Sequence, residues 1–322
     1  MEVTAQQLLL QKIKDILPAY KSMAEELAGL LDLSVDSAYR RIRGETKLTL
    51  DEAALLCTHF GIPPESLLAP IGGSVNFLYR TIKTEADFQL YLRNILQSIG
   101  KIEESKNGML MYAGADIPVF HHFQYREHAA FKIFYWLNAV MQIEDFQFKK
   151  FSSTLIGEET LDIAKAAFDA YHRINTIEIW SEDSATSTVK QILYCWEAGL
   201  FERKEDALLV TEQLRDFLTN VQRQAEIQEG NTSRILYHSE IQIGNNCVLV
   251  KAPEPSMVYL RHQTINTMVT TNASFCQETD VFMKQLIKRS VLISGSATKQ
   301  RHQFFSTIQA SVEKLLSEIQ KG

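Results

Sequence analysis

The sequence predicts an all-α bundle over residues 1–70, a linker over 71–83 and a larger α+β domain over 84–322. Three observations support this division. Residues 20–68 read as short helices joined by tight turns, four of the seven prolines lie at or before Pro70, and glycine-bounded apolar runs typical of strands begin only after Gly108. At 322 residues the chain is long enough for two or three domains, since single cores usually stop growing at about 250 to 300 residues.

The first segment, MEVTAQQLLLQKIKDILPAY, predicts a helix that ends near Pro18. It has no basic n-region, no long apolar core and no small-residue cleavage site, so it is not a secretory signal. No apolar stretch approaches the roughly 18 residues of a membrane span. The four cysteines are far apart and form no CxxC pair, which favours reduced thiols packed as small hydrophobic groups. We therefore expect a cytoplasmic protein without membrane association.

A short basic helix is predicted after Ser34. The Ser34 hydroxyl can cap it, and Asp36 in the first turn suits the positive helix end. The helix is expected to run to Arg43 and to stop at Gly44. One apolar stripe is formed by Val35, Ala38 and Ile42. The residues expected to face outward are Ser37, Arg40, Arg41 and Arg43.

Together with its neighbours, this helix outlines a DNA-reading helix-turn-helix. The segment from Ala24 to about Leu68 resembles the lambda-repressor and Cro-like (XRE-type) helix-turn-helix family, over about the first fifth of the chain. The resemblance is carried by Glu26-Leu27-Ala28, Leu31-x-Leu33-Ser34, Val35 to Arg43, Gly44, and Leu48 to Gly61 with Thr49 as cap.

The resemblance implies that the second helix of the motif enters the major groove with its N-terminal residues at the base edges. Ser37 and Arg40 are expected at base edges, Arg41 and Arg43 at phosphate or a flanking base, and Lys47 at phosphate. A homodimer is expected, because one short helix contacts too few bases and paired helices read half-sites about 34 Å apart. The full set of expected DNA-binding residues is Ser34, Val35, Asp36, Ser37, Arg40, Arg41, Arg43 and Lys47.

Three positions depart from the family pattern. Asp32 stands where the family commonly has a turn glycine, and an aspartate tolerates a left-handed conformation better than most residues. Ala24 stands where many members have a glutamine that braces the recognition helix against a phosphate. Arg41 occupies a position that is often apolar, so its side chain is either a DNA contact or a partly buried stem, and we favour the contact.

The charge balance of the bundle is not basic. Residues 1–70 contain seven Lys and Arg against ten Asp and Glu, a net charge of −3. Four of the seven cations lie between positions 40 and 47, and screening limits the reach of charges to roughly 8 Å in physiological salt. We therefore expect modest nonspecific affinity for double-stranded DNA and a dependence on dimerisation.

The larger domain mixes helices and strands. A helix is predicted from Thr84 to about Ser105, with Thr84 and Asp87, three residues on, in the pattern of a capping box. Further helices are predicted at about 158–174, 185–199, 203–228, 280–289 and 299–320. Strands are predicted at 109–113 and 176–180. The segments 234–243, 246–251 and 256–271 predict a hairpin and meander. This domain order is that of bacterial regulators, which append a sensing or oligomerisation domain to a DNA-binding unit.

The sequence offers no clear catalytic, cofactor or metal site in this domain. GxSxG, GxxxxGK[ST], HExxH and GxGxxG motifs are absent, so an enzyme is the minor hypothesis and no cofactor is expected. The histidines at 121, 122 and 128 favour a structural or surface role over metal binding. Acids such as Asp116, Glu178 and Glu240 are expected on solvated outer faces.

The aromatic residues between Phe120 and Phe151 could line an apolar cavity for a small-molecule ligand, or fill a core, which is favoured. The function predicted is that of a sequence-specific, dimeric, DNA-binding transcriptional regulator with a C-terminal sensing or oligomerisation domain. Two alternatives stay open. One is a protein-interaction adaptor that uses the same bundle, and the other is an enzyme with a regulatory helix-turn-helix.

Overall fold

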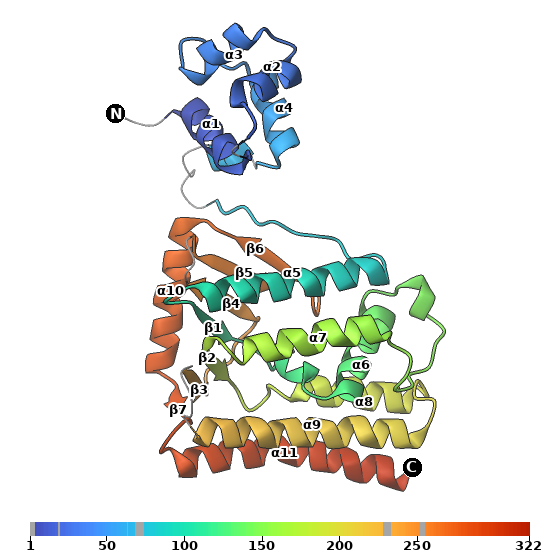
Figure 1. Ribbon diagram of the computed structural model, residues 1–322. Coiled ribbons are helices and arrows are strands. Elements are labelled where there is room, and N and C mark those ends of the chain that lie inside the picture. The colour runs from blue at the N-terminus through green and yellow to red at the C-terminus, as the bar shows by residue number, and fades with distance from the viewer. Residues whose placement is uncertain (1–3, 19, 63, 68–73, 228–232, 252–254) are drawn as a thin grey trace. The chain divides into compact units, whose positions relative to one another are not determined.

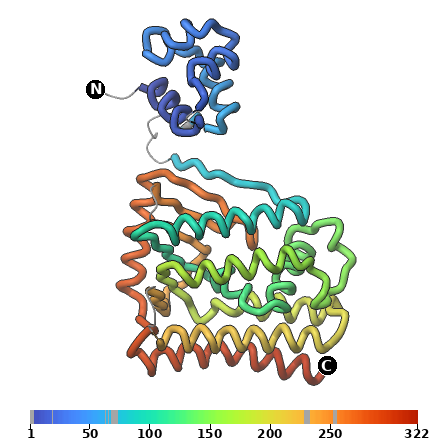
Figure 2. Tube along the Cα trace, viewed as in Figure 1, coloured from blue at the N-terminus to red at the C-terminus, as the bar shows by residue number. Residues whose placement is uncertain are grey.

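The computed structural model describes residues 4–18, 20–62, 64–67, 74–227, 233–251 and 255–322 (Figure 1). The chain divides into two compact units, Met1–Asn76 and Phe77–Gly322. Figure 2 shows the Cα trace of each unit. Of the linker expected over 71–83, residues 71–73 lie outside the described part of the chain. Leu78, which falls within that range, pairs with Val269 through two backbone hydrogen bonds and belongs to the second unit.

The first unit is a bundle of short helices. They are α1 (Ala5–Ile16), α2 (Met23–Leu31), α3 (Val35–Ile42), α4 (Leu50–Phe60) and the 3-10 turn η1 (Pro64–Leu67). The side chains of Thr4, Ser22, Ser34 and Thr49 each accept a hydrogen bond from a first-turn backbone N–H, so all four α-helices have an N-cap of the preferred chemistry. The predicted caps at Ser34 and Thr49 are confirmed.

A small apolar core holds these helices together. Its fully buried members come from all four α-helices and include Leu9, Ile13, Leu27, Ala38 and Leu56. Below about 80 residues a single core gives little stability, so the helix caps matter to this unit.

In the described part of the second unit there are seven α-helices. They are α5 (Glu85–Glu104), α6 (Arg126–Tyr135), α7 (Glu158–Tyr171), α8 (Thr186–Glu197), α9 (Lys204–Glu226), α10 (Ala273–Lys288) and α11 (Thr298–Lys321). Short turns η2 (Val119–Phe123), η3 (Trp136–Val140) and η4 (Glu144–Phe146) flank α6. The capping box expected at the start of α5 is present, with Thr84 and Asp87 as its members. Helix α10 begins earlier than expected, because the Asn272 side chain caps it at Phe275.

The second unit also contains one mixed sheet of seven strands in the order β6-β5-β4-β1-β2-β3-β7. The strands are β1 (Met109–Ala113), β2 (Asn175–Trp180), β3 (Arg234–His238), β4 (Cys247–Lys251), β5 (Met257–Arg261), β6 (Thr267–Thr270) and β7 (Val291–Leu292). Strands β1, β2 and β3 are parallel, and the remaining pairs are antiparallel.

The expected meander is confirmed for β4, β5 and β6. The expected hairpin between 234–243 and 246–251 is wrong, because β3 pairs with β2 and β7 while β4 crosses to the other side of β1.

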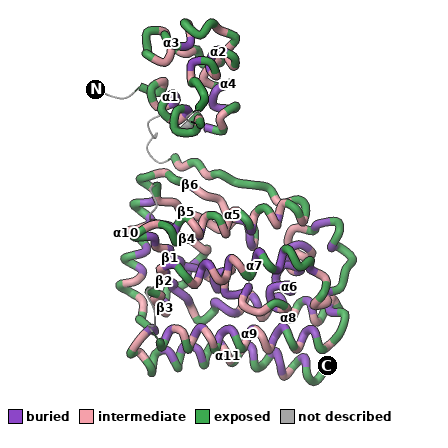
Figure 3. The backbone as a smooth tube through the Cα atoms, in the orientation of Figure 1, coloured by how far each residue is buried: buried purple, intermediate pink, exposed green. Residues whose placement is uncertain are grey.

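Helices cover both faces of the sheet. On one face α10 packs on side chains such as Met111, Ile179 and Leu249. On the other face α5 and α7 cover Leu110 and Tyr112. Successive strand residues point to opposite faces, so β1 contributes to both cores. Helices α9 and α11 lie side by side, and buried and exposed residues alternate along both of them (Figure 3).

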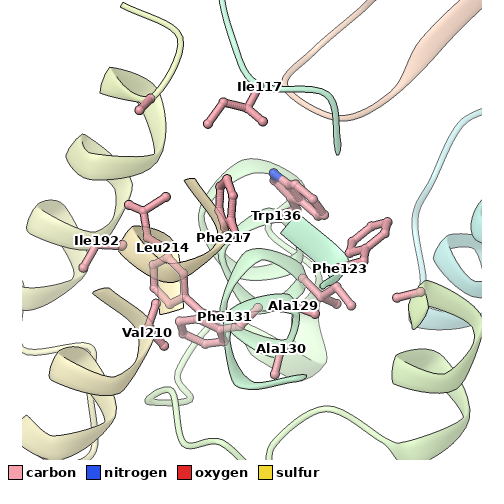
Figure 4. Close-up of a cluster of buried hydrophobic side chains, with 14 of the residues drawn as sticks. Ile117, Phe123, Ala129, Ala130, Phe131, Trp136, Ile192, Val210, Leu214 and Phe217 are labelled. Carbon is pink, nitrogen blue, oxygen red and sulfur yellow. The ribbon is translucent and has the colours of Figure 1, made fainter. Parts of the chain in front are cut away.

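The largest core lies among the helices. Figure 4 shows side chains of α6, α8 and α9 meeting there, including Phe131, Ile192, Val210 and Leu214. The aromatic residues between 120 and 151 mostly fill this core, and the buried ones are Phe123, Phe131, Phe134, Trp136, Phe146 and Phe151. Phe148 is an exception with 96% exposure. Among the described residues, no helix is long and apolar enough to cross a membrane.

Candidate nucleic-acid interface

Helix α3 lies at the surface of the first unit. Ala38 is the only residue of α3 that is fully buried. The turn that leads into the helix contains Asp32 with φ 52°, in the left-handed region, as the sequence predicted. The Ser34 hydroxyl then accepts from the Ser37 backbone N–H at 3.2 Å and donates to the Ser37 hydroxyl at 2.9 Å. The second helix of the motif therefore begins at a fixed place and direction.

The outer face of α3 combines apolar and basic side chains. Arg40 and Arg43 have side chains 61% and 52% exposed, and Lys47 in the following loop is also exposed. Val35, which was predicted to belong to the buried stripe as well as to the DNA-facing set, is 44% exposed and therefore lies on the outer face. Val35 is the first residue of α3 and lies outside the core of the bundle.

Tyr39 was missed by the sequence analysis. It is 46% exposed and lies one turn after Val35 and one turn before Arg43. The spacing of 35, 39 and 43 places these side chains on one face, and this spacing was the available signal. A tyrosine there supplies a flat apolar ring and a hydroxyl donor to whatever binds the helix.

Arg41 has a different role from the one expected. Its guanidinium donates to both carboxylate oxygens of Glu52 on α4, at 2.7 and 3.3 Å, and the two side chains are only 13% and 17% exposed. The hydrogen bond from Arg41 lowers the pKa of the Glu52 carboxyl. The predicted contact of Arg41 with DNA does not fit this geometry, because the planar fork of the guanidinium is already occupied in joining α3 to α4.

Gln6 holds the far end of α3 and was also missed. Its side-chain NH₂ donates to the carbonyls of Arg41 and Thr46, both at 2.9 Å, and its Oε1 accepts from the Leu48 backbone N–H at 3.2 Å. These three bonds fasten α1 to the loop that carries Lys47. The motif lacks the bracing glutamine at position 24, which is a buried alanine here, and Gln6 braces the loop from another helix.

An acidic side chain lies among the exposed cations. Glu45 accepts two hydrogen bonds from Arg43, at 2.7 and 3.1 Å, and lies 3.9 Å from the guanidinium of Arg40. The Arg43 hydrogen bond lowers the pKa of Glu45, so this carboxyl is ionised at neutral pH. Glu45 thus offsets part of the positive charge that α3 offers to an anion. A phosphate must compete with it for the same guanidinium groups.

The first unit is a helix-turn-helix whose second helix is exposed and basic, an arrangement typical of regulator domains. Residues 4–75 match the family model of the BetR domain, which is a helix-turn-helix-type regulator domain. The match includes α1 and with it Gln6, which lies outside the segment that carried the resemblance at the sequence level. No curated protein and no solved structure matches the chain.

Glu178 and the histidine cluster of the second unit are buried and hydrogen-bonded within the protein. The Glu178 carboxylate, only 5% exposed, accepts from Tyr171 and Trp180, both at 2.9 Å, and lies 3.0 Å from Nε2 of His121. Burial alone would raise the pKa of Glu178, but the charge and hydrogen bond of His121 outweigh it and lower the pKa to about 2. The expectation that Glu178 is solvated is therefore wrong.

The remaining histidines of the cluster are buried as well. His122 lies 3.1 Å from His128 through their ring nitrogens, and His128 lies 3.1 Å from the Val210 carbonyl. A structural or surface role was favoured for this cluster. Each of its three side chains is buried and has a bond within the protein, while Nδ1 of His121 has no hydrogen-bond partner among the described residues. In the described part of the chain no group of three His, Cys, Asp or Glu side chains has the arrangement of a metal site.

Proposed function

We propose that this protein is a sequence-specific transcriptional regulator that binds double-stranded DNA as a homodimer. The observation that carries the proposal is the presentation of α3, with Arg40 and Arg43 exposed and both helix ends fastened by side-chain hydrogen bonds. A recognition helix must hold its register to within a fraction of a base pair, and fixed helix ends supply that rigidity. We also propose that the first unit is related to the lambda-repressor family. The left-handed turn at Asp32 supports this relationship.

In this proposal Arg40 reads a base edge, and arginine there most often pairs with guanine in the major groove. Ser37 lies beside it, and its hydroxyl, which accepts from Ser34, can still donate to a base edge. Arg43 and Lys47 bind phosphate once Glu45 is displaced, and Tyr39 adds apolar contact. The second unit serves as the sensing and pairing domain, and no catalytic step is assigned to it.

Selection of random duplex DNA by the full-length protein tests the proposal. The wild type is compared with the double variant Arg40→Ala/Arg43→Ala at the same salt, and with Lys14→Ala as a control for charge loss on an exposed position of α1. We expect an inverted repeat with half-sites about 34 Å apart, retained by Lys14→Ala and lost by the double variant. Equal enrichment by all three proteins, or none by the wild type, contradicts the proposal.

The adaptor alternative has one observation in its favour. The first unit exposes large apolar side chains, among them Tyr20 at 85% and Leu50 at 86%. A protein partner that covers these residues would bind with an affinity that Arg40→Ala and Arg43→Ala leave unchanged. The same variants therefore separate the two functions.

A further inference from the structure

The second unit contains a cavity of about 370 Å³ between α5 and the sheet. Its volume falls in the range of sites that hold small molecules. The walls are mainly aliphatic and come from three separate parts of the chain, with Ile95 and Ile99 on α5, Leu110 on β1, and Val248 and Val250 on β4. Ile117 and Trp136, both labelled in Figure 4, belong to the main core and also line this cavity.

One part of the wall is polar and is built around Lys132 of α6. This lysine is 3% exposed, and its Nζ donates to Thr188 Oγ1 at 3.1 Å and to Gln191 Oε1 at 2.6 Å, both on α8. The same ammonium lies 5.3 Å from the centre of the Trp136 ring. All four side chains line the cavity. A lysine side chain is almost never buried this fully unless a negatively charged group pairs with it.

Lys132 has no such group within the part of the chain that the structure describes. No described carboxylate pairs with its Nζ, and both of its hydrogen-bond partners are neutral. Arg261, which also lines the cavity, forms an ion pair with Asp116 and is therefore already neutralised. Burial, with no opposing acid, lowers the pKa of Lys132 to about 7.

The other titratable groups near Lys132 are two histidines. His128 Nδ1 donates to the Val210 carbonyl, since a carbonyl can only accept, so its Nε2 accepts from Nδ1 of His122. Burial and the charge of Lys132 lower the pKa of both rings, to about 3 for His128. Both rings are then neutral, and Lys132 is the one group at this end of the cavity whose charge can respond to a ligand.

We propose that this cavity binds an apolar molecule that carries a single carboxylate, with the carboxylate on Nζ of Lys132 and the apolar part between α5 and the sheet. The Thr188 hydroxyl, which rotates freely, can turn to donate to the second carboxylate oxygen. At its end of the cavity Lys132 supplies one positive charge, which balances one carboxylate. Arg80, another cation of the lining, is exposed to solvent, so a phosphate ester held by Lys132 would leave its second charge unpaired at the buried end. The inference rests on the sensing role proposed above and names the chemical class of the molecule sensed.

Calorimetric titration of the full-length protein with decanoate tests this assignment. Decanol serves as the neutral probe of the same length and decyltrimethylammonium as the cationic one. We expect decanoate to bind most tightly, and Lys132→Met to weaken its binding by roughly 30-fold or more while decanol binding is unchanged. Lys190→Met, an exposed lysine of α8, is the matched control and should bind decanoate as the wild type does.

Proton uptake gives a second readout that a purely structural role of Lys132 would not produce. At about pH 8.5 the buried amine is mostly neutral, so pairing with a carboxylate requires it to take up a proton from the buffer. Titrations in two buffers of different ionisation enthalpy should show an uptake close to one proton with decanoate and none with decanol. Thr188→Val keeps the shape of the site and should weaken decanoate binding by a smaller factor than Lys132→Met.

Absence of decanoate binding, equal affinity of wild type and Lys132→Met, or binding without proton uptake would each overturn the assignment. The titrations contain no DNA. Failure of the ligand assignment is therefore seen in calorimetry, while failure of the regulator proposal is seen in the DNA selection.

Discussion

Replacing Lys132 by methionine should stabilise the second unit near neutral pH and destabilise it in alkali. Methionine has nearly the length of the lysine stem and fills the same apolar space without an ammonium group. Near neutral pH the change removes the cost of holding a buried charge. In alkali the lysine is neutral in both the folded and unfolded states, so only the loss of its hydrogen bonds to Thr188 and Gln191 remains.

The magnitude follows from the pKa of Lys132. Burial lowers it from 10.5 to about 7, and each pKa unit corresponds to about 1.4 kcal/mol, so the charged form costs the folded state roughly 4 to 5 kcal/mol. The folded state loses its proton at a lower pH than the unfolded state. The cost is therefore complete below pH 7 and disappears as the pH rises to 10.5.

The substitution also removes the donor of two buried hydrogen bonds, to Thr188 and Gln191, which destabilises the folded state by about 2 kcal/mol in total. The net change in the free energy of unfolding is then about +2 kcal/mol near pH 7 and about −1 kcal/mol at pH 10, with a crossing at about pH 9.

Urea unfolding followed by tryptophan fluorescence measures this change. All three tryptophans of the chain, Trp136, Trp180 and Trp196, lie in the second unit, so their emission reports on that unit alone. Wild type, Lys132→Met and Lys190→Met are compared at several pH values between neutral and about pH 10. The control should follow the wild type throughout.

A Lys132→Met protein that is less stable than wild type by the same amount at every pH would refute the reasoning. That result would mean that the ammonium carries its charge without cost, and hence that a negative group pairs with it inside the folded unit.

Three further predictions concern the first unit. Gln6→Ala should raise the amide exchange rates of residues 45–48 and lower the local stability of this loop by about 2 kcal/mol, because it breaks three hydrogen bonds to backbone atoms. Gln11→Ala, on the exposed side of α1, should change neither quantity. Glu45→Gln should strengthen binding to the selected duplex several-fold in fluorescence anisotropy, because Arg40 and Arg43 lose their internal competitor; weaker binding would mean that Glu45 itself contacts a base. Lys47→Ala should reduce the slope of log K against log salt by about 1, and an unchanged slope would exclude a phosphate contact.

Local chemistry predicted the parts of this fold that depend on neighbours in sequence. The Ser34 cap, the Thr84 capping box and the left-handed turn at Asp32 each arise from interactions within a few residues, and the structure confirms them. The parallel pairing of β3 with β2 was missed, because an isolated strand pattern contains no information about its partner.

Long-range side-chain contacts were missed for the same reason. Glu52 lies 11 residues from Arg41, and Gln6 lies 35 residues or more from the carbonyls it binds, so neither pairing follows from spacing. Lys132 was overlooked because lysines are ordinarily exposed. Its place inside the apolar run Ala129-Ala130-Phe131-Lys132-Ile133-Phe134 was the one available signal that it would be buried.

The order of the core-forming segments along the chain has a consequence for synthesis of the protein. Helix α11 supplies Phe304, Ile308 and Val312 to the main core and packs on α8 and α9, which are encoded far earlier. A domain that depends on such distant contacts folds slowly and only after its last helix is made, whereas residues 1–76 have all their contacts available early. The newborn chain should therefore pass through a stage in which the helix-turn-helix unit is folded and the second unit is not.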